Sequence, residues 1–181
     1  MKNVNAYATR GFNWFCNWFS KGRYDYDTDL RYYDRAIQRE PEHALFWNNR
    51  GFTWHMKGLR AWNRPACEDH ALSDYAEAIR LNPISASAIN NRAWLLATTK
   101  VDRCRNGLKA VKEATKACEL SDWKNAGYKD TLSCAYAEIG DFEQAIRWQK
   151  EALDDPFYRR QEGRIPRMKL RHFAKKQPFR E

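Results

Sequence analysis

Residues 128–153, YKDTLSCAYAEIGDFEQAIRWQKEAL, have the pattern of two helices joined by one tight turn. Before the turn, apolar residues recur at three- and four-residue steps and so share one helix face: Leu132, Ala135, Tyr136 and Ile139. Gly140 tolerates the left-handed conformation that closes a helix, and Asp141 can cap the helix that follows. A single hairpin of this size cannot bury its apolar face, so we expect copies of it elsewhere in the chain.

Copies of both halves of the hairpin occur earlier in the sequence. The first helices of two hairpins share an aromatic–Gly–aromatic opening: Tyr7, Gly11 and Trp14, and then Trp47, Gly51 and Trp54. The first helix of the third hairpin repeats the same spacing more loosely, with Ile89, Ala93 and Leu96. The second helices share a tyrosine, an alanine and a closing proline: Tyr33, Ala36 and Pro41; then Tyr75, Ala78 and Pro83. Self-similarity at a regular spacing predicts a repeat array.

These features resemble tetratricopeptide repeats: the aromatic–Gly–aromatic opening, the Gly-Asp-Phe turn at residues 140–142, the alanine positions and the terminal proline. The resemblance covers about residues 4–156. It implies an all-α, right-handed solenoid of about four helix-turn-helix repeats, followed by a basic capping helix or tail at 157–181. The approximate repeats are 4–41, 44–83, 86–120 and 126–156. Residues 88–153 are also similar to tetratricopeptide proteins of planctomycete bacteria, which concerns lineage and implies no activity.

The spacing of the repeats is longer than that of the family. Gly11 and Gly51 are 40 residues apart, Gly51 and Ala93 are 42 apart, and Ala93 and Ser133 are 40 apart, whereas the family unit has about 34 residues. A period of about 40 also suits HEAT or armadillo units, although the Gly-Asp-Phe turn favours tetratricopeptide repeats. Three hairpins therefore carry insertions between their helices.

The three insertions lie at residues 20–28, 59–70 and 99–106. The first is an acidic turn that can cap the next helix. In the second, Pro65 suits the first turn of a helix that runs to about Leu81. The third is polar and ends at Gly107, so we expect a plain loop before a helix at 108–120.

The composition indicates a folded chain, with 43% hydrophobic and 14% aromatic residues. No apolar run approaches the roughly 20 residues of a membrane span, and the N-terminal residues lack the pattern of a signal peptide. The five cysteines are an odd number without framework spacing. A reducing cytoplasm is therefore the expected compartment.

The net charge of +9 is concentrated in residues 157–181, which carry nine Lys and Arg against two Glu. Two interpretations of this tail remain open. Ile165, Met168 and Phe173 could cover the open end of the array, as a terminal repeat requires. Alternatively, the tail is a basic arm that binds nucleic acid or an anionic surface.

Enzyme and metal motifs are missing from the sequence. It contains no Gly-rich phosphate loop, no H-E-x-x-H and no G-x-S-x-G. Asp25, Asp27 and Asp29 alternate as in a calcium loop but lack its glycine and final glutamate. Cys67 and His70 form one C-x-x-H pair without the second pair that zinc requires. We therefore predict a non-enzymatic protein without a metal or cofactor.

One set of residues suggests binding. The resemblance implies that the first helix of each hairpin lines a concave groove, where asparagines hold a ligand backbone. Asn49 and Asn91 occupy equivalent positions and are followed three residues later by Phe52 and Trp94. An amide can both donate to and accept from a peptide backbone. The predicted peptide-binding groove consists of Phe12, Asn48, Asn49, Phe52, His55, Met56, Asn90, Asn91, Trp94, Thr131 and Glu138.

Other interpretations of these positions stay open. The asparagines could face water or bond to a neighbouring helix. We interpret the recurring arginines as structural, with their heads paired to acids: Arg10, Arg50 and Arg92. The basic residues that form a carboxylate clamp in some relatives are absent, because their positions hold Ala8, Asn48, Asn90 and Asp130. A preference for acidic C-terminal tails is therefore not supported.

The leading hypothesis is a protein–protein interaction module that binds an unidentified protein or peptide in its groove. The rival is a protein that binds RNA or an anionic surface through its tail. The first predicted helix, at 4–19, has aromatic residues on almost every side. That feature favours either a preceding segment or self-association through this end of the array.

Overall fold

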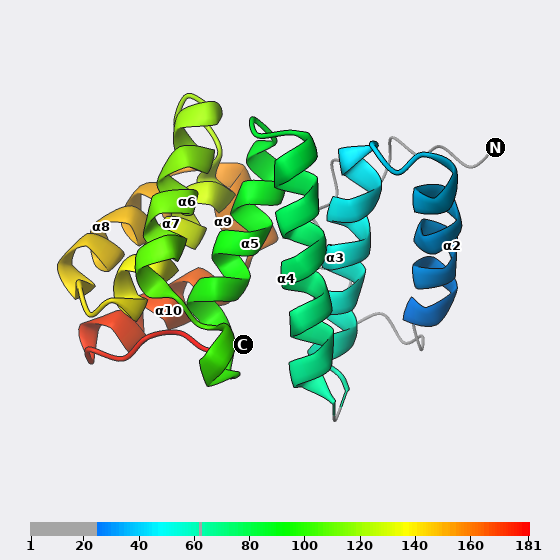
Figure 1. Cartoon of the computed structure of the whole chain (residues 1–181). Helices are drawn as coiled ribbons and strands as arrows, with labels where there is room; N and C mark the ends of the chain where they lie inside the picture. Colours follow the sequence, from blue (N-terminus) through cyan, green and yellow to red (C-terminus); the bar gives the residue numbers. More distant parts are fainter. Residues whose placement is uncertain (1–24, 62) are drawn as a thin grey trace.

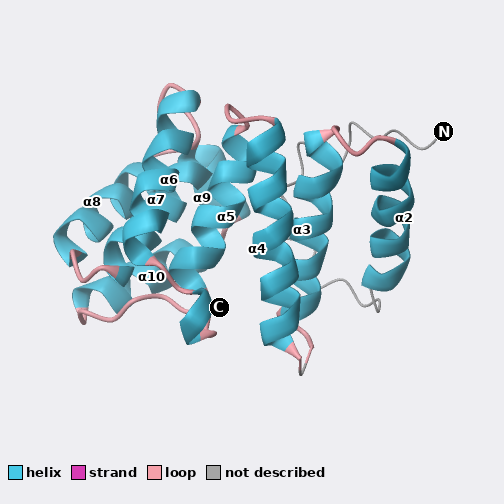
Figure 2. Ribbon diagram, viewed as in Figure 1, coloured by secondary structure: helices cyan, strands magenta, loops and turns pink. Residues whose placement is uncertain are grey.

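The structure is a computed structural model of the 181-residue chain and describes residues 25–61 and 63–181. All regular elements in these ranges are helices, and none is a strand (Figure 2). In chain order they are α2 (Tyr26–Arg39), α3 (Ala44–Gly58), α4 (Arg64–Leu81), α5 (Ala86–Thr98), the 3₁₀ turn η2 (Asp102–Cys104), α6 (Gly107–Leu120), α7 (Ala126–Glu138), α8 (Phe142–Leu153), α9 (Pro156–Gln161) and α10 (Ile165–Ala174). No helix in the described ranges is long and apolar enough to span a bilayer.

The helices form a helical solenoid of hairpins, as the sequence predicted. The pairs α3/α4, α5/α6 and α7/α8 fall within the predicted repeats at 44–83, 86–120 and 126–156, and successive pairs lie side by side (Figure 1). The first helices of these pairs contact one another, α3 against α5 and α5 against α7. We call the surface that they share the α3–α5–α7 face. The predicted first helix at 4–19, with Phe12 and Arg10, lies outside the described residues.

Short-range signals in the sequence set the helix ends. Asp141 accepts a hydrogen bond from the backbone N–H of Gln144 at the start of α8 (3.0 Å), and Gly140 before it has φ of +84°. Asp25 caps α2 in the same way, and Pro65 lies in the first turn of α4. Each of these predictions is confirmed, because each depends only on groups within one turn of the helix end.

Small residues allow the paired helices to approach closely. A Cβ atom added at Gly51 on α3 would lie 3.0 Å from the Cβ of Asp74 and 3.0 Å from the ring of Tyr75 on α4. Three alanines of the second helices are completely buried: Ala78, Ala117 and Ala152. Larger side chains at these positions would force the helices apart.

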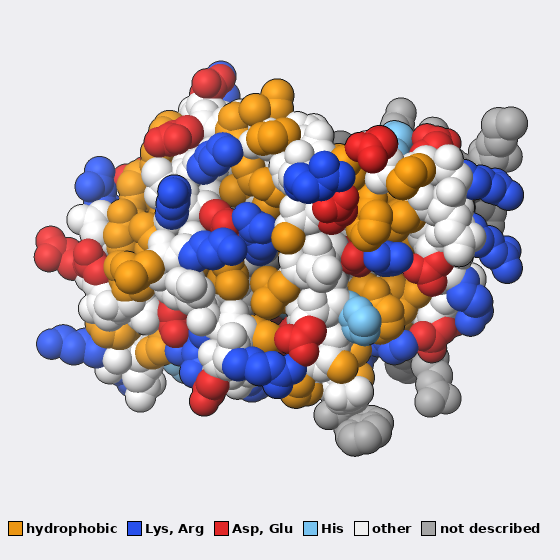
Figure 3. All heavy atoms as spheres, viewed as in Figure 1, with side chains coloured by type: hydrophobic (Ala, Val, Ile, Leu, Met, Phe, Trp, Pro, Cys, Tyr) orange, Lys and Arg blue, Asp and Glu red, His pale blue; other side chains and the backbone are white. Residues whose placement is uncertain are grey.

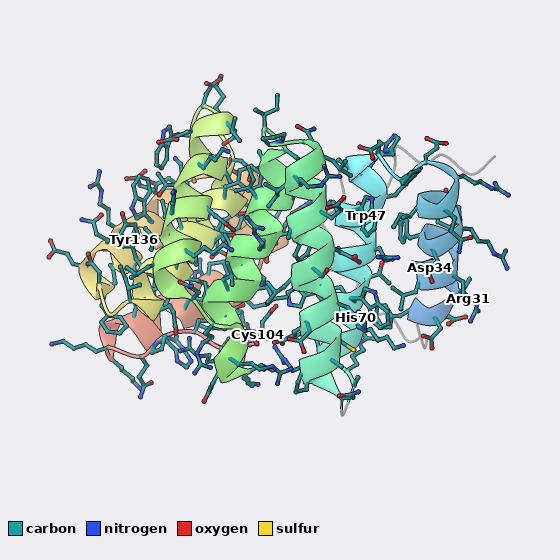
Figure 4. The ribbon with its side chains drawn as sticks, viewed as in Figure 1. Arg31, Asp34, Trp47, His70, Cys104 and Tyr136 are labelled. Atoms are coloured by element: carbon teal, nitrogen blue, oxygen red, sulfur yellow. The ribbon has the colours of Figure 1, made fainter. Side chains whose placement is uncertain are left out.

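Two of the recurring arginines tie neighbouring helices together. Arg50 on α3 donates two hydrogen bonds to Asp74 on α4 (2.9 and 2.7 Å) and one to Asp34 on α2 (2.8 Å), which is labelled in Figure 4. Arg92 on α5 donates two to Glu113 on α6 (3.0 and 2.6 Å). Bidentate pairs of this kind fix geometry as well as contribute energy. The structural interpretation of Arg50 and Arg92 is therefore confirmed.

The third insertion is more than the plain loop that we expected. Thr99 is buried, and its hydroxyl donates to the carboxylate of Glu68, a fully buried residue of α4. Arg64 Nε donates to the other oxygen of that carboxylate (2.5 Å). The expectation was wrong because the composition of the insertion does not reveal the buried acid on another helix that it satisfies.

The two tail helices cover the last hairpin. Helix α10 packs against α8, and Phe173 is buried in a cluster with Leu96 and Cys134, which belong to α5 and α7. Met168, which we expected to take part in this cover, is exposed instead. Of the three residues that the sequence assigned to the cap, only Phe173 is buried, and Ile165 is half-buried.

Candidate peptide-binding face

Asparagines from two repeats meet on the α3–α5–α7 face. Asn91 Nδ2 on α5 donates to Asn48 Oδ1 on α3 (3.1 Å), and Asn48 Nδ2 donates to Asn49 Oδ1 (3.3 Å). Asn49 and Asn91 are half-buried, whereas Asn48 is only 6% exposed. Asn91 therefore bonds to a neighbouring helix, which was one of the alternatives that the sequence left open. We call these three residues the asparagine row.

Three other residues of the predicted groove are enclosed. Met56 and Asn90 are buried, and the amide oxygen of Asn90 has no hydrogen-bond partner among the described residues. Thr131 is completely buried, and its hydroxyl donates to the carbonyl of Gly127 in its own helix (3.1 Å). The prediction that they line an accessible surface is wrong, because equivalent repeat positions share a face but not the same covering neighbours.

The chain's own last residues lie on this face, and we call residues 177–181 the tail segment. Figure 1 shows the chain running from α10 to the lower end of α5. Trp94 Nε1 donates to Glu181 Oε2 (2.9 Å), and His55 Nε2 lies 3.1 Å from the same oxygen. The backbone N–H of Glu181 donates to the carbonyl of Thr98 (3.0 Å). Residues of α3 and α5 thus hold one carboxylate between them.

The rest of the tail segment follows the same surface. Phe179 is buried, with its ring centroid 6.3 Å from that of Trp94. Arg180 forms an ion pair with Glu138 at the end of α7 and donates to the carbonyl of Ala97 (3.4 Å). The segment has no regular secondary structure, and its last three residues contact α5, α7 and α3.

A buried ion pair supports the tail segment from α10. Lys169 Nζ lies 2.5 Å from Asp130 Oδ2 on α7, and both side chains are 3% exposed. Burial opposes the charge on Lys169, but the neighbouring Asp130 raises the pKa of this lysine above its usual value. The ammonium also lies 4.5 Å from the ring centroid of Trp94 and 5.2 Å from that of Phe179.

The remaining groove residues have structural partners. Phe52 is half-buried against the cluster of Tyr75 and Leu95, and Glu138 pairs with Arg105 (3.3 Å) as well as with Arg180. Four residues that cover the face were not among the predicted groove residues: Lys169, Phe179, Arg180 and Glu181. An aromatic and an acidic residue at the end of a basic tail were the signal that could have indicated a buried segment.

The described part of the chain holds buried thiols with a raised pKa and no cluster of metal-ligating side chains. Burial raises the pKa of Cys104 to about 11 and that of Cys118 and Cys134 to about 12, so these thiols stay protonated at neutral pH. Within residues 25–61 and 63–181, no three His, Cys, Asp or Glu side chains gather as metal ligands.

Stacked helical hairpins whose first helices share one face define a tetratricopeptide-like solenoid. A thermophilic tetratricopeptide repeat protein of Thermus thermophilus has a similar structure, with a TM-score of 0.60 and 19% sequence identity over 81% of this chain and 70% of that chain. No protein-family model and no curated protein matches the sequence. The likeness shows the fold alone, and the similarity to planctomycete proteins stays a prediction.

The charge state of Glu162 should make stability depend on pH. Burial, and then the charge of Asp130, raise the pKa of Glu162 to about 7. Its unfolded pKa is about 4.3, so the protonated form favours the fold. The stability that the raised pKa of Glu162 contributes is complete below the unfolded pKa and is lost as the pH rises through the folded pKa. Glu162→Gln should therefore raise the Tm by on the order of 5 °C at about pH 8 and hardly change it at about pH 4, below the unfolded pKa.

Thermal unfolding followed by circular dichroism at both pH values measures this difference. Glu119→Gln, at an exposed position at the end of α6, is the matched control and should show no such dependence on pH. An equal rise in Tm at both pH values would contradict the assignment to the charge of Glu162.

Proposed function

We propose that this protein is a non-enzymatic interaction module that binds an extended peptide or protein segment on its α3–α5–α7 face. A tetratricopeptide-like fold suggests protein partners in general. The observation that carries the more specific proposal is the tail segment, because a stretch of chain without regular secondary structure lies on this face through a backbone hydrogen bond and side-chain anchors. A segment of another protein could make contacts of the same kind there.

The asparagine row supports a role in holding a peptide backbone. Asn49 Oδ1 and Asn91 Nδ2 are engaged within the row, whereas Asn49 Nδ2 and Asn91 Oδ1 form no hydrogen bond with any described residue. One free donor and one free acceptor on half-buried side chains can pair with the C=O and N–H of a peptide group. Such contacts would hold a backbone whatever its sequence.

A second candidate, binding of a polyanion, is favoured by the exposed cations of the tail. Seven of its basic residues are exposed and form no ion pair within the described ranges: Arg159, Arg160, Arg164, Arg167, Arg171, Lys175 and Lys176. On the face drawn in Figure 3, by contrast, Lys and Arg side chains are interspersed with Asp and Glu. A contact through these cations should weaken steeply as salt is raised.

The proposed compartment is the cytoplasm. It is supported by the cysteine content, since Cys67, Cys104, Cys118 and Cys134 are free thiols in the structure. Self-association through the predicted helix at 4–19 concerns residues outside the described ranges.

Replacing Asn49 and Asn91 together by Ala should weaken binding of a captured partner by about 1–3 kcal/mol, or roughly 5- to 150-fold. The same change removes both partners of buried Asn48, so it should also lower the free energy of unfolding by about 1–3 kcal/mol. Binding must therefore be measured by calorimetry well below the Tm of the variant. Asn82→Ala, at an exposed turn after α4, is the control and should leave affinity unchanged.

Unchanged affinity in the folded double variant would contradict the proposal. If affinity fell steeply with raised salt and did not respond to the double variant, the polyanion candidate would replace it.

A further inference from the structure

The contacts of the tail segment describe the kind of peptide that fits the α3–α5–α7 face. They fall into an aromatic position at Phe179 and an acidic position at Glu181, separated by one residue. Phe179 and the side chain of Glu181 are both enclosed, whereas Arg180 between them reaches Glu138 and has a side chain that is 26% exposed.

The aromatic position combines apolar packing with a cation. Phe179 belongs to the hydrophobic cluster that contains Leu96 and Ala97 of α5 and Phe173 of α10. Its ring lies beside Trp94 and within 5.2 Å of the Lys169 ammonium. A cation over an aromatic ring favours an aromatic side chain over an aliphatic one of similar size.

The acidic position is built from donors on two repeats. Trp94 Nε1 and His55 Nε2 both point to Glu181 Oε2, and the side chain of Glu181 is only 10% exposed. Burial opposes the charge of this carboxyl, but the hydrogen bonds from His55 and Trp94 and the charge of Lys169 lower its pKa below the usual value. The ionised form is therefore the one that the site holds.

We propose that the α3–α5–α7 face recognises an extended segment of a partner protein in which an aromatic residue is followed two positions later by Asp or Glu, and that residues 177–181 occupy this site as an internal competitor. The proposal rests on the proposed function and adds the chemistry of the partner. It also means that a partner must displace the tail segment before it can bind. Asn49 and Asn91 form no hydrogen bond with the tail segment and are half-buried, so they remain accessible to a longer ligand.

The test uses the full chain with the substitutions Phe179→Ala and Glu181→Ala, which remove both anchors of the tail segment. The probe is a fluorescent peptide with the sequence of residues 175–181, KKQPFRE, amidated at its C-terminus so that only the glutamate side chain supplies a carboxylate at that end. Fluorescence anisotropy should show that the probe binds the double variant at least roughly tenfold more tightly than the unsubstituted chain. In the unsubstituted chain, the tail segment competes for the site.

Two control peptides separate recognition from net charge. The scrambled peptide FKRQEKP has the same charge, and KKQPFRQ lacks only the final carboxylate; both should bind the double variant at least roughly tenfold more weakly than KKQPFRE. Equal binding of the scrambled peptide, or equal binding of KKQPFRE to the variant and the unsubstituted chain, would overturn the proposal. A dimer of the unsubstituted chain in size-exclusion chromatography that dissociates on adding KKQPFRE would also overturn it, because the segment would then bind a second copy.

Should the double variant fail to fold by circular dichroism, Glu181→Gln keeps the shape of the side chain and removes its charge, and the same comparison applies.

The outcomes also separate this inference from the proposed function. If KKQPFRE fails to bind while the change at Asn49 and Asn91 still weakens a captured partner, the aromatic and acidic preference is wrong and peptide binding stands.

Discussion

Replacing Lys169 by Met is expected to lower the free energy of unfolding by about 3–5 kcal/mol, the usual cost of leaving one buried charge without its partner. Lys169 lies 2.5 Å from Asp130, and both side chains are 3% exposed. Methionine fills a similar volume but leaves the buried Asp130 carboxylate without its cation. Urea denaturation followed by circular dichroism measures the loss.

Two further variants test the cause of this loss. Lys175→Met makes the same change at an exposed lysine just after α10 and should alter stability by less than about 0.5 kcal/mol. Adding Asp130→Asn to Lys169→Met removes the unpaired charge and should recover part of the loss. A loss of less than about 1 kcal/mol in Lys169→Met would show that this ion pair does not hold α10 against the array.

Replacing Phe173 by Ala should lower the free energy of unfolding by about 3–5 kcal/mol, the typical cost of a large-to-small change in a core. Phe173 is 1% exposed and packs with residues of α5, α7 and α8, so its removal leaves a cavity where α10 meets the array. The loss is measured by denaturant unfolding. It would show that the tail contributes to the core and is not a free basic arm.

Phe157 offers a matched control, because it is another phenylalanine of the tail and is 64% exposed on α9. Phe157→Ala should change stability by less than about 0.5 kcal/mol. Equal effects of the two substitutions would mean that the tail does not pack as described. In that case, the polyanion candidate would gain support.

The two predictions bear on function because the same contacts hold the tail segment in place. Lys169 contacts both Trp94 and Phe179, and Phe173 shares a hydrophobic cluster with Phe179. Helix α10 therefore positions the segment that covers part of the candidate binding face. Stability of the cap and access to the face are linked through these side chains.

The architecture could be predicted from the sequence because its causes are local or periodic. Gly140 and Asp141 end one helix and begin the next through groups a few residues away. Gly51 and Ala78 recur at spacings that place small residues where paired helices meet, and they lie there in the structure. A hairpin that repeats can bury its apolar face only against its copies, which makes the solenoid the expected arrangement.

The site could be predicted only in part. Equivalent positions brought Asn48 and Asn91 to one face, but the sequence did not show that they bond to each other. Thr99 satisfies a buried acid on another helix, and His55 meets Glu181 across 126 positions of the chain.

Periodicity determines which side of a helix a residue occupies, because that depends on 3.6 residues per turn. It does not determine what packs on that side. The residues that cover the α3–α5–α7 face depend on where α10 and the tail segment pack against the array. That position is set by the packing of Phe173, the Lys169–Asp130 pair and the donors of Trp94 and His55. These contacts join residues far apart in the chain, so tertiary structure alone decided that the face carries a segment of the protein itself.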